Sequence, residues 1–332
     1  MNDWRAPWWL GGGGPIGGNL QTIWPARISK HWTRQSLLIT GRMQRIDTPD
    51  GDFVDFNWLV EPALLDSPVL VVFHGLEGSW ASHYAQAWAH WAWEQGWGCV
   101  MPHFRGCSDQ PNRLPRAYHS GDFVEVGWML EQVAAACPQS PRMAVGISLG
   151  GNALLRWAQE AGHSGTRWVK AVAAVSSPLD LAAAGRAIGQ GFNRRVYTRM
   201  FLDTMKPKMQ AKLLQWPGFV DAQALAAASD LYEYDNVVTA PLHGFADTED
   251  YWAQCSAGPR LRGLVGIPAL VLNALNDPFL PVSALPGPDD VSAWVTLWQP
   301  AHGGHVGFPG GRWPGHVSPM PWSVGAWLQQ YL

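Results

Sequence analysis

The sequence GISLGG at residues 146–151 constrains the fold of this chain more than any other stretch. A short apolar run precedes it at 142–145, and residues 152–158 have a helical pattern. A strand, a sharp turn with a serine at its apex and a helix form the context of a G-x-S-x-G nucleophile elbow. Glycines on both sides permit a strained turn. We therefore predict that Ser148 is a nucleophile, the alternative being a glycine-rich loop with an incidental serine.

Apolar runs and helical segments alternate along much of the chain. Residues 69–73 form a continuous apolar run, typical of a parallel strand covered on both faces. The alternation predicts an α/β fold with a mostly parallel central sheet flanked by helices. Residues 36–39 and 53–59 predict an antiparallel pair at a sheet edge. Further strands are expected at 98–101, 169–175, 268–274 and 293–298, and helices at 84–94, 122–136 and 323–331.

The segment 179–258 breaks this alternation. It has no convincing strand, but has helical stretches at 182–188, 195–205, 211–215 and 222–228. We predict that it is a helical cap inserted between core segments 36–178 and 259–332, and caps of this kind commonly cover an active site and move. Residues 1–35 are expected to form an irregular, glycine-rich arm packed over the domain.

Composition narrows the classes of function. With 47% hydrophobic and 15% charged residues the chain can bury a large core, and a net charge of −3 gives no basis for binding nucleic acid. The four cysteines have neither C-x-x-C spacing nor clustered histidines, so we expect free thiols and no metal site. Neither a secretory signal nor an apolar run of roughly 18 residues is visible. We expect a cytoplasmic protein.

Two further residues complete a candidate triad with Ser148. Asp277 and His305 each follow a predicted strand, in the chain order Ser, Asp, His of α/β-hydrolases. His305 would act as the base and Asp277 would orient it. His302 is the rival base, and His305 is favoured because Gly303 and Gly304 free its backbone.

The loop HGLEG at 74–78 directly follows the third main strand, the place where this kind of fold supplies one backbone amide of the oxyanion hole. We predict that the backbone amides of Leu76 and Leu149 form the oxyanion hole. Each such donor is worth about 3 kcal/mol of transition-state stabilisation. His74 is expected to shape the loop rather than to take part in catalysis.

Several longer motifs make the chain resemble the YheT-like branch of the α/β-hydrolase superfamily, the bacterial relatives of eukaryotic ABHD ester and phospholipid hydrolases. In that family these stretches carry a Ser-Asp-His triad, which falls here on Ser148, Asp277 and His305. Asn19 stands where the family usually has histidine, so the arm is assigned no catalytic role, and Asn276 replaces an acid before Asp277. The matching stretches are LQTIWP (20–25), HGLEGS (74–79), HFRGCSDQPNRLPRAYHSGD (103–122), GISLGGN (146–152), PLHGFADTEDYW (241–252), NALNDPF (273–279) and HGGHVGF (302–308).

The charged residues of the motif at 103–122 allow two interpretations. They could recognise a substrate head group, or they could form an internal charge network that holds a long loop, and we favour the network. These residues are Arg105, Asp109, Arg113, Arg116 and Asp122.

The leading hypothesis is a serine carboxylester hydrolase that needs no metal or organic cofactor. The resemblance implies short- to medium-chain esters or glycerolipids as substrates, with transient contact at a membrane surface left open. The cap residues Met200, Phe201 and Met205 are candidates for an apolar acyl pocket. Two alternatives are an acyltransferase, disfavoured because no histidine is followed by aspartate five positions later, and a non-catalytic scaffold that binds a lipid or a partner. The sequence does not indicate the oligomeric state.

Overall fold

A computed structural model describes residues 4–27 and 38–332. At its centre the described residues form an eight-stranded sheet in the order β1-β2-β4-β3-β5-β6-β7-β8. The β1–β2 and β2–β4 pairs are antiparallel, and all other neighbours are parallel, which confirms the predicted α/β class. The strands are β1 (Arg42–Asp47), β2 (Phe53–Val60), β3 (Val69–Phe73), β4 (Gly98–Pro102), β5 (Arg142–Ile147), β6 (Val172–Val175), β7 (Ala269–Leu272) and β8 (Val295–Trp298).

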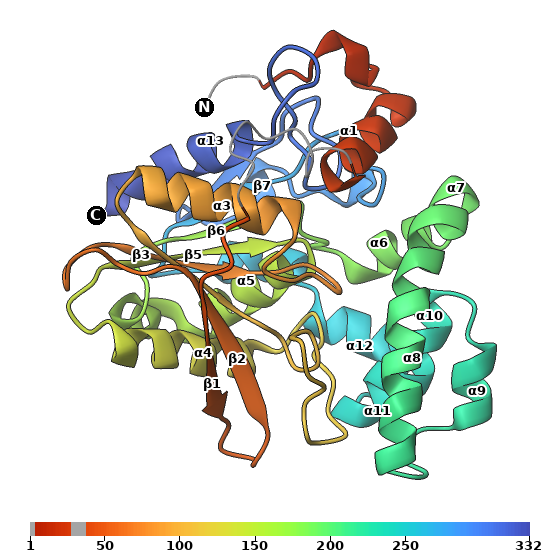
Figure 1. Cartoon of the computed structure of the whole chain (residues 1–332). Helices are drawn as coiled ribbons and strands as arrows, with labels where there is room; N and C mark the ends of the chain where they lie inside the picture. Colours follow the sequence, from red (N-terminus) through yellow and green to blue (C-terminus); the bar gives the residue numbers. More distant parts are fainter. Residues whose placement is uncertain (1–3, 28–37) are drawn as a thin grey trace.

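Helices cover both faces of this sheet (Figure 1). Helices α3 (His83–Glu94) and α13 (Pro319–Leu328) lie on one face, and α4 (Phe123–Ala136) and α5 (Leu149–Ala161) on the other. Strand β3 is apolar throughout because both of its faces are buried. Val71 and Phe73 pack into the core beneath α4 and α5, whereas Leu70 and Val72 pack into the core beneath α3 and α13. Successive side chains of β3 therefore pack into the hydrophobic cores on opposite faces of the sheet.

The first strand differs from the prediction. Residues 36 and 37 lie outside the described residues, and 38–39 are not in a strand. The strand that pairs with β2 is β1, with Arg42 opposite Trp58 and Asp47 opposite Phe53. β1 is polar and mostly exposed because it lies at the sheet edge, so a search for apolar runs selected the wrong residues.

The segment predicted to be a cap, residues 179–258, is helical and lies beside the sheet and its flanking helices, at the right of Figure 1. The two helices expected at 195–205 and 211–215 are one, because a π-helical turn at Arg194–Thr198 continues into α8 and α8 passes through Pro207. The helices of this segment after residue 230, α10, α11 and α12, were not predicted. The cap helices are α6 (Leu181–Ile188), α7 (Gly191–Asn193), α8 (Arg199–Gln215), α9 (Ala222–Ala227), α10 (Leu231–Tyr234), α11 (Ala240–His243) and α12 (Thr248–Cys255), with a second π-helical turn at Asp235–Thr239.

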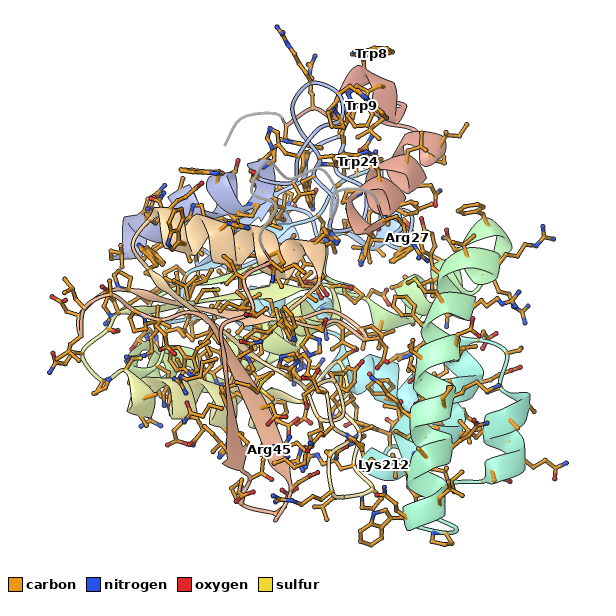
Figure 2. All side chains as sticks on the ribbon, in the orientation of Figure 1. Trp8, Trp9, Trp24, Arg27, Arg45 and Lys212 are labelled. Atoms are coloured by element: carbon orange, nitrogen blue, oxygen red, sulfur yellow. The ribbon has the colours of Figure 1, made fainter. Side chains whose placement is uncertain are left out.

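The N-terminal arm is not irregular, contrary to the prediction. It forms helix α1 (Pro15–Arg27), on which Trp24 is buried and packs edge-on against Trp9 with ring centroids 5.4 Å apart (Figure 2). Gly18 is in van der Waals contact with neighbouring backbone, since a Cβ there would come within 3 Å of the carbonyl oxygen of Asn276. The glycines that suggested flexibility therefore mark close packing.

Two predictions from composition can be compared with the structure. Cys99, Cys107, Cys137 and Cys255 are all buried free thiols, as their spacing predicted. None of the helices within residues 4–27 and 38–332 combines the length and apolar character that crossing a membrane requires.

Candidate active site

Ser148 occupies a strained turn between β5 and α5. Its backbone has φ 52° and ψ −119°, a region that residues with a Cβ rarely adopt. A Cβ at Gly146 or Gly150 would come within 3 Å of backbone atoms, so glycine is required at both positions. The turn leaves the Ser148 side chain partly exposed at its apex.

The structure brings Ser148, His305 and Asp277 into one chain of hydrogen bonds. His305 Nε2 lies 2.9 Å from Ser148 Oγ, and His305 Nδ1 lies 2.9 Å from Asp277 Oδ2. With its proton on Nδ1, the neutral ring donates to Asp277 and accepts from the Ser148 hydroxyl. The Asp277 side chain is fully buried and that of His305 is 10% exposed.

The environment of Asp277 is apolar except for a few donors. Burial raises the pKa of its carboxyl, while the His305 ring beside it opposes that rise. The backbone amide of Phe279 donates to Asp277 Oδ1 at 2.8 Å. The Phe279 ring also lies against the His305 imidazole, with centroids 4.2 Å apart. Phe279 therefore holds both Asp277 and His305, which are also hydrogen-bonded to each other.

The rival histidine points elsewhere. His302 Nδ1 accepts a hydrogen bond of 3.1 Å from the backbone amide of Ala6, and the ring lies beside Gly13 in the N-terminal arm. The structure therefore places His305, and not His302, at Ser148.

The loop after β3 is shaped by a buried neutral histidine. His74 Nδ1 donates to the Gly75 carbonyl oxygen at 2.7 Å, and Nε2 accepts from the Phe104 amide at 3.0 Å. Burial lowers the pKa of His74 to about 3, which fits a ring with one donor and one acceptor. Leu76 and Leu149 both line the cavity above Ser148, and Leu149 begins α5, where backbone amides have no partner within the helix.

An ion pair connects this loop with the cap. Lys208 Nζ on α8 lies 2.7 Å from Glu77 Oε2, and the Tyr118 hydroxyl donates to Glu77 Oε1 at 2.9 Å. The Glu77 backbone adopts a left-handed φ of 56° and donates its amide to the Tyr118 oxygen. Sequence analysis did not single out Lys208 or Tyr118. Their shared partner, Glu77, lies more than 40 residues away from each of them in the chain.

A cavity of about 520 Å³ opens at Ser148 beneath the cap. Its lining is largely apolar and includes Phe201 and Met205 from α8, two of the three predicted pocket residues. Met200 is 40% exposed and is not among the described residues that line the cavity, because it lies on the outer face of the same helix. The cavity therefore has apolar walls on the side formed by α8.

Most charged residues of the 103–122 motif are satisfied by partners within the protein. Arg105 pairs with Asp50 at 2.8 Å, with Asp52 at 3.1 Å and with Glu125. Arg113 pairs with Asp47 and Arg116 with Asp122, whereas Asp109 is exposed. Lys212 of α8 (Figure 2) donates to carbonyl oxygens of the same loop. These contacts favour an internal network over head-group recognition.

Helix α1 contacts the loops that carry His305 and Asp277, which sequence analysis missed. The Gly303 amide donates to Gln21 Oε1 and the His305 amide donates to Thr22 Oγ1, both at 2.8 Å. The Gly304 amide donates to Asn276 Oδ1 at 3.0 Å. Two features of the sequence could have indicated these contacts: the LQTIWP motif at 20–25, and Asn276 in place of the acid that is usual in the family. A sequence does not by itself show contacts between residues more than 280 positions apart.

The described residues contain no group of three or more histidine, cysteine, aspartate or glutamate side chains arranged to hold a metal ion.

Comparison with known proteins identifies the family to which the chain belongs. Residues 68–311 match the family model described as the alpha/beta hydrolase fold. The chain belongs to the α/β-hydrolase family. This α/β-hydrolase is 38% identical over 320 residues to "Putative esterase YheT" of Escherichia coli (strain K12), covering 95% of this chain and 91% of that protein. It is thus a member of the YheT-like branch, as its motifs predicted.

More distant relatives agree with this assignment. Human "Phospholipase ABHD3" is 26% identical to this α/β-hydrolase over 280 residues, covering 82% of this chain and 68% of that protein. Among solved structures, an esterase of Pyrococcus furiosus, Pf2001, superposes with a TM-score of 0.56 at 15% identity, covering 92% of this chain and 96% of that one. At that identity the similarity shows the shared fold alone.

Proposed function

We propose that this α/β-hydrolase is a serine carboxylester hydrolase that works through an acyl-enzyme on Ser148. That it is a hydrolase of esters follows from its family and from relatives named as an esterase and as phospholipases. The observation that carries the mechanism is the hydrogen-bonded line from Ser148 Oγ through the His305 ring to Asp277, at the floor of an apolar cavity.

The chemistry follows from the role that each group can take. Ser148 Oγ attacks the ester carbonyl while His305 Nε2 accepts its proton, and the carbonyl oxygen becomes an oxyanion. The amides of Leu76 and Leu149 donate to that oxyanion. His305 then returns the proton to the departing alcohol, leaving an acyl-enzyme. Water repeats the sequence, releases the carboxylic acid and restores Ser148, while Asp277 stays ionised and holds the ring.

The proposed substrates are esters with an apolar acyl chain of short to medium length, including glycerolipids. The apolar cavity walls formed by Phe201 and Met205 support this class, and so does the similarity to a protein named as a phospholipase. Transient contact with a membrane surface and a location in the cytoplasm stay predictions.

The test is a series of p-nitrophenyl esters from acetate to palmitate, followed on the millisecond scale. The proposal predicts a burst of one p-nitrophenol per active chain, because acylation releases the alcohol before water releases the acid. Added short alcohols separate hydrolysis from acyl transfer through the ratio of free acid to new ester. A purified, folded protein that turns over none of these esters would support the scaffold alternative.

A further inference from the structure

We propose that helix α1 is a positioning element of the active site, and that Gln21 and Thr22 hold the loops that carry His305 and Asp277. This inference rests on the mechanism proposed above, and it adds residues that do not touch the substrate. Neither Gln21 nor Thr22 is among the described residues that line the cavity.

Thr22 fixes the backbone from which the imidazole extends. Its Oγ1 accepts the 2.8 Å hydrogen bond from the His305 amide and donates to the Gly18 carbonyl oxygen at 2.7 Å. The Thr22 side chain is buried, so water does not compete for these bonds. A shift of the His305 backbone would move Nε2 relative to Ser148 Oγ, and misplacement by about 1 Å can cost roughly 100-fold in rate.

Gln21 connects the loop of the base with the loop of the acid. Its Oε1 accepts from the Gly303 amide at 2.8 Å and from Asn276 Nδ2 at 3.0 Å. Its Nε2 donates to the carbonyl oxygens of Leu10 and Gly12, at 3.1 and 2.7 Å. The fully buried amide thus uses both its donors and accepts twice, which defines one orientation. Asn276 immediately precedes Asp277, so this one side chain joins both loops.

The histidine loop needs such external support. Val306 and Phe308 have left-handed φ values of 62° and 41°, conformations that cost energy in residues with a Cβ and persist when the surroundings enforce them. Helix α1 contacts this loop without intervening side chains. A Cβ at Gly304 would come within 3 Å of Thr22, and one at Gly307 would come within 3 Å of the Gln21 carbonyl.

The same helix also contacts the cap. Tyr197, in the π-helical turn before α8, donates its hydroxyl to Asn19 Oδ1 at 2.8 Å. Ile23 packs into a cluster that includes Phe279, whose ring lies on His305. The arm therefore meets the acid loop, the base loop and the cap at one place.

The matched pair of variants is Thr22→Val and Thr22→Ser. Valine keeps the shape but removes the acceptor, so we expect turnover per active site to fall tenfold or more, while KM changes by less than about twofold. Serine keeps the hydroxyl and should stay within about threefold of wild type. Ile16→Ala is the control, because Ile16 lies on the same helix and is 76% exposed.

Each variant is first titrated with a fluorophosphonate to count active sites, and kcat and KM are then measured per labelled site. Loss of stability alone would lower the labelled fraction and leave turnover per site unchanged. Wild-type turnover per site in Thr22→Val, or an equal loss in Thr22→Ser, would overturn the proposal. If Thr22→Val does not fold, Gln21→Met provides the same comparison. Ester hydrolysis retained by Ser148→Ala would instead contradict the proposed function.

Discussion

The buried His74 leads to a quantitative prediction about stability at acid pH. Its folded-state pKa of about 3 lies far below the ordinary value of 6.5, because burial disfavours the charged ring. Between these values the unfolded chain binds a proton that the folded chain does not. The contribution of His74 to stability is therefore complete above pH 6.5 and is lost as the pH falls toward 3.

The size of the effect follows from proton linkage. The slope of the free energy of unfolding approaches about 1.4 kcal/mol per pH unit once the pH is well below 6.5, so about 2 kcal/mol is lost between pH 6.5 and pH 4.5. Burial also lowers the pKa values of His103, His119 and His243, which act in the same direction. Burial raises the pKa of Glu125 to about 7 and that of Asp235 to about 6, and these two groups act in the opposite direction, so the effect of His74 has to be isolated by a variant.

Comparison with His74→Gln isolates the single group. Glutamine does not titrate, and its carbonyl oxygen can replace Nε2 as acceptor for the Phe104 amide. Urea unfolding followed by tryptophan fluorescence should be measured at several pH values from 7 to 4.5. The wild-type free energy of unfolding should fall more steeply than that of the variant, with a difference in slope that approaches about 1.4 kcal/mol per pH unit by pH 5. Parallel curves for the two proteins would refute the reasoning.

Three other predictions concern the site, the cap and the charge network. His305→Ala should lower turnover by roughly 10⁴-fold and His302→Ala by tenfold or less, and equal mild losses in kcat would contradict the assignment of the base. Phe201→Ala and Met205→Ala should shift the preferred p-nitrophenyl ester toward longer chains, at about 0.8 kcal/mol per buried methylene, with the exposed Met200→Ala as control. An unchanged chain-length profile would place the acyl pocket elsewhere. Arg105→Met should destabilise the fold by about 3–5 kcal/mol in thermal or urea unfolding, because it leaves the Asp52 and Glu125 carboxylates buried without their cation; a stable variant with a raised KM would favour head-group recognition instead.

The features predictable from sequence were those encoded locally. The β5 strand, the turn at Ser148 and helix α5 follow one another without a break, so glycine spacing and apolar periodicity were sufficient. The apolar runs of the parallel strands were equally clear, because both faces of each strand are covered.

The features that sequence could not predict depend on distant contacts. The glycines of α1 suggested an irregular arm, yet glycine at 18 is required by the backbone of Asn276, which is distant in the sequence. Two helices were predicted at 195–205 and 211–215, yet α8 continues through Pro207 as one helix. Strand β1 is polar because its place is the sheet edge. Which face of α8 meets the cavity is likewise set by packing, which is why Met205 lines the cavity and Met200 does not.

The most direct test of the account is the site of covalent labelling by a fluorophosphonate. Mass spectrometry of the digested protein should find one adduct per chain, on the peptide that contains Ser148, and none in Ser148→Ala. The same variant should keep its fold and lose ester hydrolysis by roughly 10⁴-fold or more. An adduct on another residue, or a Ser148→Ala protein with more than about a tenth of wild-type turnover, would contradict the account.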